Sequence, residues 1–542
     1  MAMPYSMSPL SASMPPPHVL TRATLVAFPR IHSVHRYDSA INNPDSFMTQ
    51  AGFGAITRDG IRLTHHMAYL YCSPSRRSFL SGRFPNHINT AQAPICSNYL
   101  PLQFTLLPAK LKAAGYATHM VGKGHLGYMT TDHLPVNRGF DSHLGYLAHG
   151  EGYNWGNGGN APSRGSHWQD FCVGSNVTNN LTRYCKKDMW HNKATGWDLV
   201  DHIAYSTNFY TRRAVDLIQA HDPKQPFYLH LTHQAVHNPW EEPPLSGQIP
   251  NGSAWWDQTW GSMLNVLDKG IANVTTALRA KGMWETTLVV LVSDNGGAPG
   301  ASPSDPTGRT TMANNWPLRG TKLTPWEGGT RVAAVVGGGF VPLRLRGSSS
   351  DVLMHMADWY PTLANLAGAV ATDPAVVNGS VHDVDGMDMW PAITGANASS
   401  PRPWLPTTGG TILWQQPDGT ILKYLTDARR SRLFSPNGAA TSTPLFFLLS
   451  RVGFGLPSTP LAPCDESSTM ACSISYPCPL ATDWCLQLSN VVTNLGLRSI
   501  RLDVERHDPT WLERDPCRGV RVGLANRPGH LRRLHSQQPL PL

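Results

Sequence analysis

Apolar segments alternate with amphipathic ones through the middle of the chain, and this alternation constrains the fold more than any other feature. The amphipathic segments are Phe104–Ala114, Ser206–His221 and Asp257–Lys281, and the apolar ones are Ala117–Val121, Phe227–Thr232 and Thr287–Val292. Helical periodicity marks the first group, and short apolar runs mark the second as buried strands. Strands that are apolar along their length belong to parallel sheets covered on both faces. The sequence therefore predicts an α/β fold, with a mainly parallel central sheet flanked by helices.

Polar residues follow these strands directly. Lys123 and His125 come after the first strand, His237 after the second, and Asp294 and Asn295 after the third. In open α/β sheets, ligands bind outside the carboxyl ends of the strands. We therefore expect a functional site at this edge of the sheet.

The segment CSPSRRSFLSGR, residues 72–83, combines groups suited to anion chemistry. Pro74 disfavours the helical region for Ser73, so we expect the chain to turn after Cys72 and to begin a helix near Ser75. A helix start offers N–H groups and a positive dipole end, and Arg76 adds a guanidinium fork that binds oxyanions. In isolation such a cysteine would be structural. The whole segment instead predicts a cysteine-derived nucleophile that handles sulfate or phosphate.

The same segment resembles the signature of the type I sulfatases, a family of the alkaline phosphatase superfamily. The pattern C-x-P-S-R-x-x-x-L-x-G-R is matched at Cys72, Pro74, Ser75, Arg76, Leu80, Gly82 and Arg83. The resemblance runs from about residue 43 to about residue 395, and the NNWPLRG and GYNWG segments are most similar to the arylsulfatase B group. It implies a sulfuric ester hydrolase that cleaves sulfate esters of sulfated glycans. It also implies that the formylglycine-generating enzyme converts Cys72 to formylglycine.

Two further catalytic residues follow from this resemblance. GKGHLG at residues 122–127 is similar to the family's G-K-W-H-L-G and implies catalytic roles for Lys123 and His125, beside Cys72 and Arg76. Gly124 stands where the family has tryptophan. This substitution removes an aromatic packing element beside Lys123 and His125.

Two substrate-binding residues are also carried over. HQAVHNPW at residues 233–240 implies that His237 contacts the substrate, whereas His233 is expected to be structural. NNWPLRGTKLTPWEGGTR at residues 314–331 implies that Lys322 binds the sulfate.

The metal site expected from the resemblance is incomplete. VSDNGG at residues 292–297 implies that Asp294 and Asn295, with the oxygens of a formylglycine derived from Cys72, bind Ca²⁺, with Mg²⁺ as an alternative. The family's other ligands are two adjacent aspartates that end the opening strand. No adjacent pair exists early in the chain, where the acidic residues are Asp38, Asp45 and Asp59. Ala23–Phe28 imitates the opening strand but is followed by proline and arginine, so we expect poor cation binding.

Four regions are expected along the chain. Residues 1–42 are predicted to be an atypical leader, disordered or misassigned, and residues 43–399 a sulfatase catalytic domain that lacks its usual opening strand. The resemblance implies a smaller C-terminal domain with an antiparallel sheet at 400–490. Residues 491–542 form an Arg-rich tail, again expected to be disordered or misassigned.

Sequons and cysteines favour the secretory pathway, with an extracellular or lysosome-like destination. The N-x-S/T sequons are Asn176, Asn180, Asn251, Asn273, Asn378 and Asn397. Cys172 and Cys185 suit a local disulfide, although the leader lacks the pattern of a signal peptide. No run of about 18 apolar residues predicts a membrane span. Half of the net charge of +8 lies in residues 486–542, so the charge does not indicate a nucleic-acid partner.

Three functional hypotheses are compatible with these patterns. The first is an arylsulfatase-like hydrolase. The second is a phosphoester hydrolase on the same superfamily scaffold, against which the full motif at residues 72–83 speaks. The third is an inactive, sulfatase-like protein, which the missing aspartate pair favours.

Overall fold

A computed structural model gives the structure of the protein, and in it two units, Met1–Leu461 and Ala462–Leu542, are described separately. The structure describes residues 24–28, 50–88, 99–127, 129–147, 204–238, 240–244, 255–298, 313, 315, 318–377, 380–396, 400–408, 411–416 and 419–425, and short strands at 154–155, 190–191, 194–195, 300–301, 310–311, 445–449, 500–503 and 521–524. Among the helices in these ranges, none has the length and hydropathy needed to cross a membrane.

A ten-stranded sheet forms the centre of the first unit, in the order β14-β2-β13-β10-β1-β9-β3-β4-β6-β7. Its strands are β14 (Ser348–His355), β2 (Ile61–Met67), β13 (Ala334–Gly337), β10 (Thr287–Val292), β1 (Thr24–Phe28), β9 (Phe227–Thr232), β3 (Ala117–Gly122), β4 (Ser142–Gly145), β6 (Trp190–His191) and β7 (Ala194–Thr195). Only β13 and β6 run against the others. The predicted mainly parallel sheet is confirmed, and β9 and β10 have the predicted bounds.

The opening strand, which we expected to be missing, is present at the centre of the sheet. β1 pairs in parallel with β10 on one side, Thr24 beside Thr287, and with β9 on the other, Thr24 beside Phe227. Thr24 and Leu25 are buried. The prediction of a leader without a place in the fold is therefore wrong for these residues, because even a short apolar segment is held when parallel neighbours bond both of its edges.

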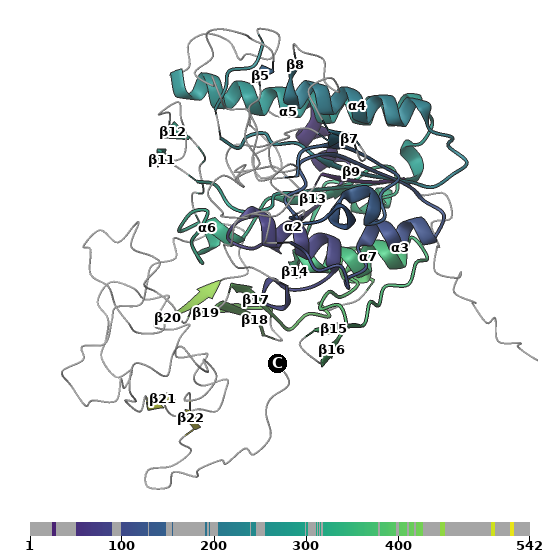
Figure 1. Ribbon diagram of the computed structural model, residues 1–542. Coiled ribbons are helices and arrows are strands. Elements are labelled where there is room, and N and C mark those ends of the chain that lie inside the picture. Colours follow the sequence, from purple (N-terminus) through teal and green to yellow (C-terminus); the bar gives the residue numbers. More distant parts are fainter. Residues whose placement is uncertain are drawn as a thin grey trace, which may run out of the picture. The chain divides into compact units, whose positions relative to one another are not determined.

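Helices cover both faces of this sheet (Figure 1). On one face, α4 (Ser206–Ala220) and α5 (Trp255–Ala280) pack on each other and share an apolar core with β9 and β10. The other core includes side chains of α2 (Cys72–Ser81), α3 (Leu107–Ala113) and α7 (Trp359–Leu366). Burial on both faces explains why β9 and β10 are buried at every position.

Helix α2 begins three residues earlier than predicted. Tyr71 is its extended N-cap residue, and Pro74 is accommodated in the first turn, where its missing N–H has no partner to lose. The helix ends at Gly82, whose φ of 70° is the left-handed conformation of a helix C-cap. A Cβ atom at this glycine would also lie 2.9 Å from the Tyr360 ring. Backbone conformation and space thus both require the glycine of the motif.

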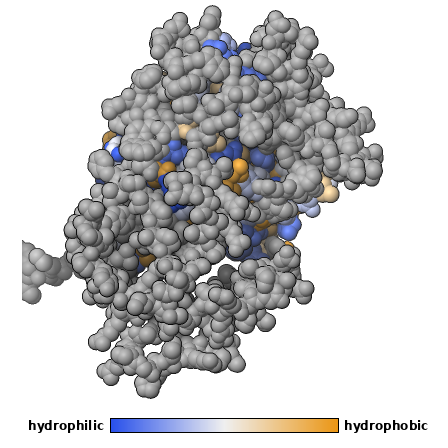
Figure 2. All heavy atoms as spheres, turned by 90° about the vertical axis from the view of Figure 1, so that its left-hand side faces the viewer, coloured by the Kyte–Doolittle hydropathy of each residue, from blue (hydrophilic) through white to orange (hydrophobic). Residues whose placement is uncertain are grey.

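A four-stranded antiparallel sheet follows the main sheet, as predicted. It has the order β17-β18-β19-β20, with β17 (Trp404–Thr408), β18 (Thr411–Gln415), β19 (Ile421–Leu425) and β20 (Leu445–Leu449). Leu405, Leu413 and Ile421 pack against Met67 of β2 and against Phe84. On the face drawn in Figure 2, the described residues mix hydrophilic and hydrophobic colours at short range.

The remaining helices are short. They are α1 (Ala55–Arg58), α6 (Glu327–Thr330) and α8 (Trp390–Ile393). The boundaries of the four predicted regions stay predictions. The predicted disulfide cysteines and all sequons except Asn273 lie outside the described residues, and Asn273 is exposed on α5.

Candidate active site

Cys72 stands at the N-terminus of α2, directly after the loop that follows β2. Its side chain is buried, and its Sγ accepts a hydrogen bond from Lys322 Nζ at 3.6 Å. The Ser75 hydroxyl, one turn into the helix, accepts the backbone N–H of Tyr69 at 2.9 Å. This bond holds the loop in front of the helix, so that the cysteine is presented at the helix start. The structure thus brings together two predicted residues that lie far apart in the sequence.

Arg76 connects three of the predicted site segments. Its Nε donates to Asp294 Oδ2 at 3.0 Å, and its Nη1 donates to the Lys123 carbonyl oxygen at 3.0 Å. The Arg76 and Asp294 side chains are 1% and 0% exposed. A buried charge is tolerated when it is paired and hydrogen-bonded. Arg76 therefore joins α2 to the ends of both β10 and β3.

Backbone hydrogen bonds place the loop with Lys123 and His125. Lys123 N donates to the Thr232 carbonyl at 2.9 Å, and Gly124 N donates to Tyr146 O at 2.7 Å. The Ser73 hydroxyl of α2 donates to the His125 carbonyl at 3.1 Å. These bonds hold the loop without the tryptophan of the family motif.

The backbone is closely packed around Gly124. A Cβ atom on Gly124 would lie 3.3 Å from Tyr146 O, closer than most such contacts. His125 adopts a φ of 59°, which is uncommon outside glycine. The loop is therefore shaped by its neighbours β9 and β4, and its histidine adopts an uncommon backbone conformation.

The two histidines after β9 differ in environment. His233 is fully buried, its Nε2 is hydrogen-bonded to Thr211 Oγ1 at 3.0 Å, and burial lowers its pKa to about 3. This supports the expected structural role. His237 donates from Nδ1 to the Asn238 carbonyl at 2.6 Å, because a carbonyl oxygen can only accept. That bond stays within its own turn and does not join His237 to Cys72.

The turn after β10 offers a candidate half of a cation site. Asp294 and Asn295 are both buried. The Asn295 amide donates to the Gly296 carbonyl at 2.8 Å, while its Oδ1 is buried and has no hydrogen-bond partner among the described residues. An unsatisfied amide oxygen beside a carboxylate suits a hard cation such as Ca²⁺ or Mg²⁺.

The other half of this site is not formed by the described residues. In the part of the chain that the structure describes, no group of three or more His, Cys, Asp or Glu side chains could hold a metal. Phe28, the last residue of β1, pairs with Leu291, three positions before Asp294. Pro29 and Arg30 come next in the sequence. The residues present thus fit a cation in part only.

The loop with Lys322 is fixed by contacts from two sides. Lys322 N donates to the Gly297 carbonyl at 2.7 Å, and Leu323 N donates to the Leu70 carbonyl at 2.8 Å. The first bond ties the loop to the chain after β10, and the second ties it to the chain just before Cys72. The tip of the loop is therefore anchored beside the cysteine.

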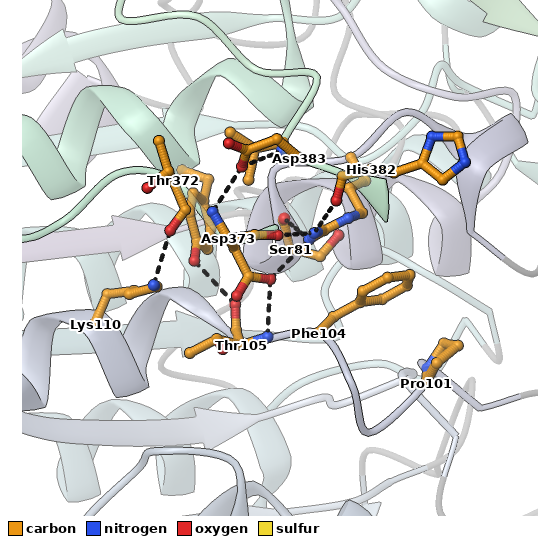
Figure 3. A network of polar contacts seen from close by, with 12 residues as sticks. Ser81, Pro101, Phe104, Thr105, Lys110, Thr372, Asp373, His382 and Asp383 are labelled. Atoms are coloured by element: carbon orange, nitrogen blue, oxygen red, sulfur yellow. Dashed lines mark hydrogen bonds and ion pairs between the residues drawn. The ribbon is translucent and has the colours of Figure 1, made fainter. Parts of the chain in front are cut away.

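Arg83, the last residue of the motif, forms buried contacts with Asp373 and Phe104. Its Nη1 donates to Asp373 Oδ2 at 2.9 Å, and its guanidinium lies 4.2 Å from the centroid of the Phe104 ring. Asp373 also accepts from Thr105 N at 3.0 Å, in the network of Figure 3. The two motif arginines thus have different surroundings, Arg76 at the site and Arg83 in the scaffold.

Sequence reasoning did not identify three supporting residues. Thr232 donates its hydroxyl to the Lys123 carbonyl at 2.8 Å. Glu327, at the base of the loop with Lys322, forms a buried ion pair with Lys423. Thr232 looks like any strand residue, but a lysine among the apolar residues of β19 is a signal that could have been noticed.

Comparison with known proteins gives consistent results. The Sulfatase family model matches residues 36–369. Mouse arylsulfatase J is 34% identical over 355 residues, which cover 64% of this chain and 52% of that protein. Dog N-acetylgalactosamine-6-sulfatase is 28% identical over 362 residues, covering 63% of this chain and 60% of that protein. The chain therefore matches between half and two thirds of the length of these relatives.

Solved structures share the fold. A structure of Ps i-CgsB in complex with k-i-k-neocarrahexaose superposes with a TM-score of 0.59 at 23% identity, covering 75% of this chain and 84% of that one. The PsFucS1 sulfatase from Pseudoalteromonas sp. superposes with a TM-score of 0.56 at 18% identity, covering 81% and 83%. At this level of identity the likeness establishes the architecture alone.

Proposed function

The chain belongs to the sulfatase family, and from this premise we propose that it is a sulfuric ester hydrolase that cleaves sulfate esters of sulfated glycans. The observation that carries the proposal is the meeting of Cys72 and Lys322 at the start of α2, with Arg76 buried one turn away. A helix start, a lysine and an arginine together suit a tetrahedral oxyanion. The name of the dog relative, N-acetylgalactosamine-6-sulfatase, supports a sulfated sugar as the substrate.

Cys72 would carry the nucleophile after conversion by the formylglycine-generating enzyme. A formylglycine at this position would supply, once hydrated, a hydroxyl that attacks the sulfur of the ester, so that the S–O bond to the alcohol breaks and the alcohol leaves. Loss of a proton from the second hydroxyl would then expel sulfate and restore the aldehyde. Lys322 would bind a sulfate oxygen, since its Nζ already reaches the side chain at position 72. The burial of Cys72 would keep bulk water away from the reacting group.

Lys123, His125 and His237 would bind the sulfate and move protons. Lys123 is fully buried, beside the backbone that Arg76 holds. His125 would accept a proton as a general base, and the uncommon backbone conformation at this residue would aim its ring. In His237 the Nδ1 proton is committed to a carbonyl, so Nε2 is the nitrogen that would contact the leaving oxygen.

Asp294 and Asn295, with the modified side chain of Cys72, would hold a divalent cation, Ca²⁺ or Mg²⁺. Such a cation offsets charge on the sulfate oxygens. The described residues fit such an ion only in part. The family's usual aspartate pair has no counterpart after β1 in the sequence.

The sequons support a glycoprotein of the secretory pathway, with an extracellular or lysosome-like location. Asn273 is exposed on α5 and is accessible for glycosylation. The expected partners are a sulfated glycan and the formylglycine-generating enzyme, with no nucleic acid.

The test is expression of the full chain together with the formylglycine-generating enzyme. We expect mass spectrometry of the Cys72 peptide to show an aldehyde, and an aryl sulfate to be hydrolysed, with Cys72→Ala as the inactive control. A thiol at position 72 would remove the sulfatase mechanism. If the aldehyde is present at position 72 but no aryl sulfate is hydrolysed, the hypothesis of an inactive, sulfatase-like protein is favoured. Faster hydrolysis of an aryl phosphate than of an aryl sulfate would favour the phosphoester hydrolase.

A further inference from the structure

The loop that carries Lys322 is closed on itself at its base. We call residues 319–331 the lysine loop. Gly328 N donates to the Arg319 carbonyl at 2.7 Å, which joins its two arms. A Cβ atom on Gly328 would lie 2.1 Å from the Gly320 oxygen, so only glycine allows the arms to approach this closely. The position of Lys322 at the tip therefore depends on how the base is held.

A buried ion pair holds this base to the small antiparallel sheet. Glu327, the first residue of α6, accepts from Lys423 Nζ at 2.7 Å, and the two side chains are 5% and 1% exposed. Lys423 Nζ also lies 3.4 Å from the Thr330 hydroxyl. Glu327 Oε2 is buried without a hydrogen-bond partner among the described residues. The carboxylate thus depends on Lys423 for compensation of its charge.

An apolar contact lies next to the ion pair between Lys423 and Glu327. Leu425 packs against Trp326, the residue before Glu327. The guanidinium of Arg319 lies 3.9 Å from the centroid of the Trp326 ring, from the opposite arm of the loop. Strand β19 therefore contacts two adjacent residues at the base of the lysine loop, Trp326 and Glu327.

Burying a lysine at position 423 costs free energy unless its charge is paired, as it is with Glu327. Along β19, the buried positions are Ile421, Lys423 and Leu425, and the first and last are apolar as such a face requires. Burial lowers the pKa of Lys423, which measures the unfavourable desolvation of its charge, while Glu327 acts in the opposite direction. A strand that only needed to pack would carry an apolar residue here.

We propose that Lys423 is a positioning residue for Lys322: through Glu327, the small C-terminal sheet fixes the lysine loop and thereby the amine that binds the sulfate. The inference rests on the proposed function for the role of Lys322, but not for the coupling of the two segments. If Lys423 is removed, the Glu327 carboxylate is left buried without its compensating charge. Its movement toward water would loosen the base of the loop.

The coupling is tested by amide hydrogen exchange of the full chain, which needs no activity. In Lys423→Met, the amides of Lys322 and Leu323 should exchange about tenfold faster or more, because their hydrogen bonds open with the loop. Removing both charges, with Lys423→Met and Glu327→Gln together, should restore slow exchange. Leu422→Met, on the other face of β19, is the matched control and should leave exchange unchanged. Unchanged exchange in Lys423→Met would overturn the proposal.

The action through Lys322 is tested with inorganic sulfate as the probe. Lys423→Met should weaken sulfate binding in calorimetry by about tenfold, whereas the same change in a Lys322→Met background should have no further effect. An equal loss in both backgrounds would show general loosening and overturn the positioning role. If the unaltered chain and Lys322→Met bind sulfate alike, the proposed function fails at Lys322, while the exchange experiment still decides the coupling.

Discussion

Arg76 Nε lies 3.0 Å from Asp294 Oδ2, and both side chains are shielded from solvent. The pair joins α2, one turn after Cys72, to the chain after β10, where Asn295 Oδ1 has no hydrogen-bond partner among the described residues. The cysteine and the candidate cation ligands are thereby held in one rigid arrangement. Because one oxygen of Asp294 is already committed to the arginine, a cation must share this carboxylate with it.

Breaking this pair should affect stability and activity together. Arg76→Met removes the buried guanidinium that pairs with the Asp294 carboxylate, which costs about 3–5 kcal/mol of the free energy of unfolding. Hydrolysis of an aryl sulfate should also be lost. Urea denaturation and steady-state kinetics measure the two effects.

The control is Arg402→Met, which breaks another buried ion pair, Arg402 Nε to Asp358 Oδ2 at 3.0 Å, outside the site. Its destabilisation should be similar, but the folded fraction should keep its turnover. Equal residual activity per folded molecule in both variants would contradict a role for Arg76 at the site.

Lys322→Met should weaken ground-state binding of the sulfate group. We expect KM for an aryl sulfate and the inhibition constant of inorganic sulfate to rise by about tenfold or more, since a charge-assisted hydrogen bond is removed. Lys112→Met removes an exposed lysine on α3 that pairs with Asp141, and should change neither constant. An unchanged inhibition constant in Lys322→Met would place sulfate binding elsewhere.

His125→Ala should lower kcat rather than raise KM. Loss of a general base costs about a hundredfold or more in rate, and the backbone bonds that hold this loop do not use the imidazole ring. Thermal unfolding should therefore be nearly unchanged, which separates a chemical from a structural role. A large loss of stability with normal turnover by the folded fraction would refute the assignment.

Acid should destabilise the protein through its buried histidines. Burial lowers the pKa of His66 to about 3, and its Nε2 accepts from Trp359 Nε1 at 2.9 Å. Between pH 6.5, the ordinary pKa of a histidine, and about pH 3, His66 binds a proton in the unfolded chain but stays neutral in the folded chain. The free energy of unfolding should thus be unaffected above pH 6.5 and fall by about 1.4 kcal/mol per pH unit for each such histidine as pH drops from there toward 3.

The variant His66→Gln isolates this contribution, because an amide oxygen can still accept from Trp359. Urea denaturation at pH 7, 6, 5 and 4.5 should show a shallower pH dependence than in the unaltered chain. Identical slopes would mean that His66 is protonated in the folded state.

Calcium should stabilise the unaltered chain only weakly. A ligand raises the melting temperature according to its concentration relative to its dissociation constant, and the described residues offer half a site. Pro29→Asp with Arg30→Asp adds two carboxylates directly after β1, whose last residue pairs near Asp294. The calcium-dependent rise in melting temperature should then increase, and Asn295→Ala in the same background should remove the gain. A large rise in the unaltered chain would show that ligands come from other residues.

Local sequence patterns determine much of the fold of this protein. The apolar runs of β9 and β10 and the helical periodicity of α4 and α5 are sufficient to predict an α/β fold. The spacing of apolar residues shows whether a strand or helix is buried on one face or on both. The motif at Cys72 predicted the candidate site, and some of its residues have a local reason, such as the left-handed φ of Gly82.

Tertiary structure alone decided which distant segments meet. Thr24–Phe28 has the apolar sequence of a strand, but its place at the centre of the sheet follows only from pairing with β9 and β10. The contact of Lys322 with Cys72 and the burial of Lys423 against Glu327 likewise join segments from different parts of the chain. The spacing of apolar residues in the sequence indicates which side chains are buried. It does not indicate which residues they contact, because those contacts depend on how all strands of the sheet pack together.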